Sequence, residues 1–131
     1  PHDYKTYILP HLKGVFGELK NLGVPVINFS TGTSTMLDTV QKAGGDVLSF
    51  DWRIEIDEAR NILGADQPVQ GNLDPVTLFA PLPVIRERVH DILRRAGPKG
   101  HIFNLGHGIL QHTPVDHVKA VAEMVHEFKY E

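Results

Sequence analysis

Short apolar runs alternate along this chain with longer segments in which apolar side chains recur every three or four residues. The short runs are typical of strands buried on both faces of a parallel sheet, and the longer segments are typical of amphipathic helices. The pattern predicts strands at about 24–29, 47–50, 69–71 and 102–105. It predicts helices at about 11–21, 34–43, 54–63 and 83–96, a short helix after Asp74-Pro75, and a last helix that starts at Thr113-Pro114.

Proline and aspartate give further signals at the ends of these elements. Pro10 has no backbone N–H, so we expect it to interrupt the first amphipathic segment with a turn before the helix starts. Asp74 and Pro75 are the residue types favoured at the N-cap and at the first helical position. In the helix at 83–96, the spacing predicts a core face formed by Ile85, Val89, Ile92 and Leu93. In the last helix, it predicts a core face formed by Val115, Val118, Ala122, Val125 and Phe128.

Strands and helices that alternate at this spacing indicate parallel strands joined by right-handed crossovers. Four such units make either a small open α/β sheet or half of a (β/α)8 barrel, which uses eight units in on the order of 250 residues. The chain opens at Pro1 directly in an amphipathic pattern. This favours the half-barrel, with residues 1–131 as a single fragment of a longer one-domain protein. Exposed outer strands then predict that the isolated fragment dimerises or aggregates.

Composition narrows the classes of function. The 131 residues carry a net charge of −3 without a basic stripe, which argues against nucleic acid as a partner. No apolar run approaches the ~20 residues of a membrane span. The absence of cysteine excludes disulfides, thiolate metal sites and thiol nucleophiles, and it fits a reducing cytoplasm. The eight histidines do not cluster at metal-ligand spacing, so no metal is expected.

Candidate chemistry follows the predicted strands. Ligand sites of parallel α/β proteins lie at the carboxyl ends of the strands, where loops far apart in sequence become neighbours. Residues at or just after these ends form a possible pocket rim: Asp51, Trp52, Asn72 and Asn104. Each also has a purely structural interpretation, because Asp51 could cap the next helix, Trp52 could pack in the core, and Asn72 could belong to the turn before Asp74-Pro75.

His107 is the strongest candidate for ligand binding. It follows the last predicted strand and is flanked by Gly106 and Gly108, which tolerate backbone conformations closed to other residues and leave space around the imidazole. A histidine placed there is able to donate to an anion or exchange a proton near neutral pH. The alternative is a buried histidine bonded to a backbone carbonyl, which would not need two flanking glycines.

The loop at 30–35, S-T-G-T-S-T, follows a strand and opens a helix, so it could cradle a phosphate. It lacks the lysine and the glycine spacing of a P-loop. A small anion-binding α/β module therefore remains open as a function of a different class from an enzyme.

Three motifs together resemble a known family. S-F-D-W at 49–52, V-Q-G-N-L-D-P at 69–75 and F-N-L-G-H-G-I at 103–109 are similar, in order and spacing, to the C-terminal portion of the uroporphyrinogen decarboxylase family. Leu9-Pro10 and the closing T-P-V-D-H-V segment match as well, so the resemblance covers essentially the whole chain. It implies the C-terminal half of a (β/α)8 TIM barrel in a cytoplasmic, homodimeric enzyme of haem biosynthesis.

The implied reaction converts the four acetate side chains of the tetrapyrrole uroporphyrinogen to methyl groups, giving coproporphyrinogen and CO2 without a cofactor or a metal. Of the family's functional residues, only the histidine of N-L-G-H-G carries over, as substrate-binding His107. The family's pocket aspartate, tyrosine and serine are expected upstream of Pro1, so no catalytic residue is assigned and the chain alone is expected to be inactive. Corrinoid methyl-transfer enzymes share the barrel but hold zinc with cysteine and histidine, which this chain's lack of cysteine argues against.

Overall fold

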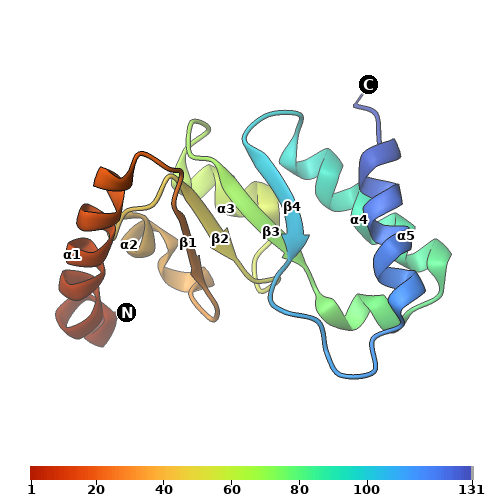
Figure 1. The fold of residues 1–131 in the computed structure, drawn as a ribbon, viewed down its shortest axis with the longest axis horizontal. Coiled ribbons are helices and arrows are strands. Elements are labelled where there is room, and N and C mark those ends of the chain that lie inside the picture. The colour runs from red at the N-terminus through yellow and green to blue at the C-terminus, as the bar shows by residue number, and fades with distance from the viewer. Residues whose placement is uncertain (131) are drawn as a thin grey trace.

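The computed structural model describes residues 1–130 and contains one four-stranded sheet in which every pair of neighbours is parallel (Figure 1). The strands follow one another across the sheet in chain order, as β1 (Ile27–Ser30), β2 (Val47–Phe50), β3 (Val69–Leu73) and β4 (His101–Leu105). The helices that lead into and connect them are η1 (Tyr4–Ile8), α1 (Leu9–Leu19), α2 (Leu37–Gln41), α3 (Ile56–Leu63), α4 (Leu82–Ala96) and α5 (Val115–Glu127).

Parallel neighbours in chain order confirm the predicted fold class. Each crossover carries a helix, and short 3₁₀ segments complete the connections at η2 (Lys20–Leu22), η3 (Ser34–Met36) and η4 (Pro75–Phe79). Four βα units in this order correspond to half of the strands of a (β/α)8 barrel. Asp74 caps η4 as predicted, because its Oδ1 accepts from the Val76 N–H at 2.9 Å.

Two clusters of buried side chains join the sheet to the helices. In the first, strand residues of β2 and β3 pack on α2 and α3, and its members are Leu37, Leu48, Phe50, Ile56, Ala59, Leu63, Val69 and Ala96. In the second, the end of β3 packs on η4, α4 and α5, through Leu73, Leu78, Ile85, Val89, Leu93, Val121 and Met124. The predicted core face of α4 is confirmed, since Ile85, Val89 and Leu93 are buried and Ile92 is partly buried against both clusters.

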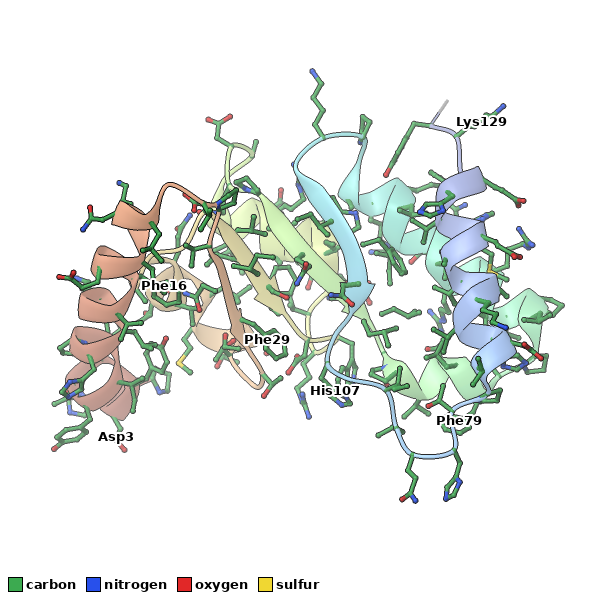
Figure 2. The ribbon with its side chains drawn as sticks, in the orientation of Figure 1. Asp3, Phe16, Phe29, Phe79, His107 and Lys129 are labelled. Carbon is green, nitrogen blue, oxygen red and sulfur yellow. The ribbon has the colours of Figure 1, made fainter. Side chains whose placement is uncertain are left out.

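The opposite face of the sheet carries exposed apolar side chains on the two outer strands. Ile27 and Phe29 on β1 are 44% and 52% exposed, and Ile102 on β4 is 46% exposed (Figure 2 labels Phe29). In a closed barrel, side chains on this face point into the interior. β1 and β4 each have one free edge in the part of the chain described by the structure.

Two local predictions were wrong. Pro10 does not interrupt the helical segment, because it lies in the first turn of α1, where a backbone N–H has no helical partner to lose. The core face of α5 is also shifted: Val115 is 67% exposed, whereas Val121 and Met124 are buried against α4. Of the predicted face, Val125 and Phe128 do pack against this cluster. The spacing alone could not fix this rotation, because the apolar positions of α5 extend around more than one face.

Candidate functional site

The carboxyl ends of the strands lie at one edge of the sheet, and His107 lies just beyond the end of β4 at that edge (Figure 2). His101 begins the same strand and so lies at the opposite edge. Trp52 follows β2, and Asn104 is the residue before the last of β4. The predicted neighbourhood of loops far apart in sequence is thus present, and the loop after β2 contacts both the loop after β1 and the loop after β4.

The imidazole of His107 is held by two contacts. Its Nδ1–H is 2.6 Å from the carbonyl oxygen of Gly108, to which it donates, so Nε2 is the ring nitrogen left for a ligand. Its ring also packs against the indole of Trp52, with centroids 4.7 Å apart and planes inclined at 74°. His107 is only partly buried, so this orientation is fixed in a place that solvent still reaches.

Gly106 is needed for this contact, but for a different reason from the one predicted. Neither Gly106 nor Gly108 has a positive φ. A Cβ on Gly106 would lie 2.7 Å from Trp52 Cε3, 2.9 Å from Trp52 N and 3.0 Å from Asp51 Cα, whereas a Cβ on Gly108 would have no neighbour within 4 Å. Gly106 therefore allows the loop after β4 to approach the loop after β2. Gly108 has no such role, because a Cβ there would not collide with any atom.

Asp51 is 2% exposed and its carboxylate is fully engaged. Oδ2 accepts from the Gly32 N–H at 2.6 Å and from Arg53 Nη1 at 2.6 Å, and Oδ1 accepts from the Arg53 N–H at 3.0 Å. Burial alone raises the pKa of Asp51, but the two backbone hydrogen bonds together with the bond and charge of the Arg53 guanidinium hold this pKa below its ordinary value. Asp51 therefore ties the loop after β1 to the loop after β2, and it does not cap α3, whose N-cap is Glu55.

Asn72 is also a buried support. It is 4% exposed, and its Nδ2 donates to the carbonyl oxygens of Asp51 at 3.1 Å and Ile54 at 2.6 Å. Asn72 lies inside β3, which extends to Leu73 and not only to Gly71 as predicted. Its side chain fixes the backbone that presents Trp52.

The remaining candidates are Asn104 and the loop at 30–35. Asn104 is exposed, and its Oδ1 accepts from the neighbouring Leu105 N–H at 2.8 Å. This hydrogen bond does not use the side-chain NH2 group of Asn104. In the loop at 30–35, the Gly32 N–H is used by Asp51 and the hydroxyls of Ser30 and Thr33 bond each other at 2.8 Å. These groups are thereby occupied and offer little to a phosphate.

Arg53 is the residue at this edge that sequence reasoning missed. Its guanidinium carbon lies 4.7 Å from the centroid of the Trp52 ring, and its Nη1 is bonded to Asp51. The available signal was its position directly after Asp51-Trp52, at a strand end. What could not be seen from sequence is that the side chain folds back over the indole.

No group of three or more histidine or acidic side chains is arranged to hold a metal ion among residues 1–130. Within the same residues, no helix is long and apolar enough to cross a membrane.

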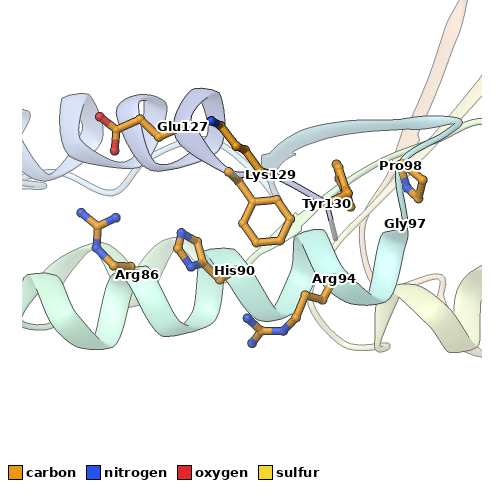
Figure 3. Close-up of a pocket in the computed structure, with 9 residues that line it drawn as sticks. Arg86, His90, Arg94, Gly97, Pro98, Glu127, Lys129 and Tyr130 are labelled. Carbon is orange, nitrogen blue, oxygen red and sulfur yellow. The ribbon is translucent and has the colours of Figure 1, made fainter.

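A cavity of about 820 Å³ lies between α4 and the segment after α5, away from the strand ends that carry His107 (Figure 3). Arg86, His90 and Arg94 line it along α4, with Phe128 and Tyr130 from the other side. Burial lowers the pKa of His90, and the charges of Arg86 and Arg94 lower it further. Gly97 and Pro98 also line this cavity and precede β4, so it is adjacent to the amino end of that strand.

Consecutive parallel βα units with aromatic and polar side chains at the carboxyl ends of the strands place this chain among the α/β-barrel proteins. The amino-acid sequence then identifies the family. Residues 1–128 match the family described as uroporphyrinogen decarboxylase, and the chain belongs to that family.

Individual relatives agree with the family match. The chain is 55% identical over 128 residues to the uroporphyrinogen decarboxylase of Carboxydothermus hydrogenoformans and 50% identical over 128 residues to that of Solibacter usitatus. Each alignment covers 97% of this chain and 37% of the relative, so the chain spans little more than a third of the length of these relatives. Among solved structures, a methyltransferase from Methanosarcina mazei superposes with a TM-score of 0.81 over 97% of this chain and 37% of that one. At 18% identity, this similarity shows the fold alone.

Proposed function

We propose that the protein containing this chain decarboxylates the four acetate side chains of uroporphyrinogen, releasing CO2 and leaving coproporphyrinogen. The observation that carries this proposal is the match over residues 1–128, together with relatives of this name at 50–55% identity. The motifs that carry the resemblance include the contact pair Trp52 and His107, which lies at the edge where barrel enzymes bind ligands.

The chemistry requires a place for the electrons left when CO2 departs. Protonation of the electron-rich pyrrole makes a cationic ring that accepts them, so the reaction needs no cofactor or metal. A carboxylate near that ring stabilises the developing charge, and a proton donor completes the methyl group. We assign neither role to a residue of this chain, because the buried carboxylate of Asp51 is already engaged in three hydrogen bonds.

His107 is proposed to bind substrate. With Nδ1–H bonded to the Gly108 carbonyl, Nε2 is available in two ways. In the neutral ring it accepts a hydrogen bond, such as one from a pyrrole N–H, and in the imidazolium ring it donates to a carboxylate. Trp52 and Asn104 are proposed to line the rim of the same pocket. Asp51 and Asn72 are buried and hold the loop that carries Trp52.

The setting of the reaction is proposed from the family resemblance. We propose a cytoplasmic homodimer that acts on a small-molecule tetrapyrrole, with this chain as one fragment of a single barrel domain. The isolated 131-residue chain is then expected to be inactive, since it spans only 37% of the length of its relatives.

The test is product analysis with the intact protein. Uroporphyrinogen is incubated with it under reducing conditions, and the porphyrins obtained after oxidation are separated by the number of carboxylates they retain. The expected result is stepwise loss of four carboxylates to coproporphyrinogen, with release of CO2. Absence of decarboxylation by a folded protein would contradict the proposal, and corrinoid-dependent methyl transfer by the same sample would support the alternative within the barrel superfamily.

A further inference from the structure

Arg53 is a cation at the strand-end edge to which neither the family resemblance nor the proposed reaction assigns a role. Its side chain is 52% exposed, whereas that of its ion-pair partner Asp51 is 2% exposed. The guanidinium carries five N–H groups, and within residues 1–130 its hydrogen bond is the one from Nη1 to Asp51 Oδ2. Its other N–H groups make no hydrogen bond within these residues.

The Asp51 carboxylate fixes the direction of this side chain without depending on it for its own burial. Two backbone N–H groups, from Gly32 and Arg53, already bond both carboxylate oxygens. Solvent reaches the guanidinium and screens its charge, which weakens the contribution of this ion pair to stability. The small contribution of this ion pair to fold stability does not by itself explain why the Arg53 guanidinium is held over the indole.

Trp52 brings Arg53 and His107 to the same ring. The guanidinium lies over the indole with 4.7 Å from its carbon to the ring centroid, and the imidazole packs at a steep angle with 4.7 Å between centroids. The indole is in turn held by Gly106, which contacts its Cε3 edge, and by the Asn72 bonds to the backbone on either side. Arg53 and His107 therefore both contact the same indole.

We propose that Arg53 and His107, carried on the Trp52 ring, form a subsite that binds one carboxylate side chain of the substrate, with Asp51 as the positioning residue for Arg53. This inference rests on the proposed function, because that function supplies a polycarboxylate ligand. A planar guanidinium suits a carboxylate, which it binds through paired N–H donors. Arg53 thus acts in binding and in the choice of side chain presented to the reaction centre, and not in proton transfer.

The first experiment compares arginine variants in the intact protein. Arg53→Gln removes the charge, Arg53→Lys keeps it without the fork, and Arg86→Gln removes an exposed arginine of α4 as the matched control. Arg53→Gln is expected to raise KM for uroporphyrinogen roughly tenfold with kcat changed less than twofold, which corresponds to about 1.4 kcal/mol of binding. Arg53→Lys should recover part of this loss, and Arg86→Gln should leave both constants unchanged. An unaltered KM in Arg53→Gln, or an equal rise in Arg86→Gln, overturns the proposal.

A second measurement separates binding from turnover. The oxidised macrocycle uroporphyrin carries the same carboxylate side chains and does not react, so its dissociation constant is measured by quenching of its fluorescence. Binding by the parent protein that is weakened about tenfold in Arg53→Gln supports the subsite. If the parent neither binds uroporphyrin nor decarboxylates uroporphyrinogen, the proposed function has failed. If the parent does both and Arg53→Gln is unchanged, only the subsite has failed.

The positioning role of Asp51 is tested by non-additivity. Asp51→Asn keeps one oxygen, which serves one of the two backbone N–H groups, and removes the charge that orients Arg53. The KM of Asp51→Asn and of the double variant with Arg53→Gln should match that of Arg53→Gln alone, because residues that act as one unit do not add. A double variant whose effect is the product of the two single effects contradicts this role. Thermal unfolding of each variant shows whether a change in KM follows from loss of folded protein.

Discussion

Gly106 touches Trp52 so closely that a methyl group on its Cα would come within 2.7 Å of the indole Cε3. The next residue is His107, whose imidazole packs on the same indole. The loops after β2 and β4 therefore meet at a point where only a hydrogen atom fits, and the position of His107 depends on that fit.

Gly106→Ala is expected to destabilise the intact protein by about 1–3 kcal/mol, since two of the three close neighbours of the new Cβ are backbone atoms that cannot rotate away. Gly108→Ala is the matched control, because its Cβ would meet no atom within 4 Å and its φ is not positive. Urea unfolding of both variants measures the difference. Equal stability of the two would contradict the packing argument.

His107→Ala should weaken substrate handling while the fold is retained, because the imidazole is partly exposed and its one hydrogen bond goes to the adjacent residue. We expect kcat/KM for uroporphyrinogen to fall by at least tenfold. His126→Ala, which removes an exposed histidine of α5, serves as the control and should leave the kinetics unchanged. Parent-like kinetics in His107→Ala would remove the residue from the site.

Asn72→Ala should cost about 1–3 kcal/mol of unfolding free energy, because it leaves the carbonyls of Asp51 and Ile54 without the donors they have in the folded protein. Asn104→Ala should change stability far less, since its Oδ1 bonds only the next N–H of an exposed position. Denaturant unfolding gives both values. A stable Asn72→Ala protein would show that water replaces the amide in the loop after β2.

The lowered pKa of His101 predicts that the folded protein loses stability in mild acid. Burial lowers its pKa and the charge of Arg60 lowers it further, against the opposing effect of the hydrogen bond to the Gly71 carbonyl. As pH falls through about 6.5, the usual value for histidine, the unfolded chain takes up a proton before the folded chain does, so stability falls until the lower folded pKa is passed.

His101→Gln should therefore lose less stability between pH 7.5 and pH 5.5 than the parent protein. Part of the slope should remain, because the pKa of His90 is lowered in the same direction. His2→Gln, at an exposed position, should keep the full slope. Urea titrations at the two pH values give the comparison, and an unchanged slope in His101→Gln would refute the assignment.

The exposed sheet face predicts that the isolated 131-residue chain associates, because β1 and β4 have free edges beside the exposed side chains of Ile27, Phe29 and Ile102. Phe29→Lys should reduce this association, and Ile62→Lys, on the outer side of α3, should not. Sedimentation velocity over a range of concentrations measures it. A monodisperse monomer of the parent chain at high concentration would count against the prediction.

The sequence by itself determined the order of elements, their parallel arrangement and the family. Apolar periodicity records which side chains leave water, so α4 with buried Ile85, Val89 and Leu93 could be predicted almost residue by residue. The cap at Asp74 was predictable too, because both of its partners are local. Where apolar residues surround a helix, as on α5, periodicity did not decide which of them would be buried.

Only the tertiary structure decided which strand-end residues are buried supports and which ones are available to a ligand. Asp51 and Asn72 looked equivalent to Trp52 in the sequence, yet they are buried supports. Arg53, whose only signal was its position next to Trp52, lies over the indole. Gly106 is required by close packing, whereas the sequence pattern pointed to backbone freedom. These differences depend on contacts between segments far apart in the chain. Such contacts form only when the parallel sheet brings the ends of β1, β2 and β4 to one edge.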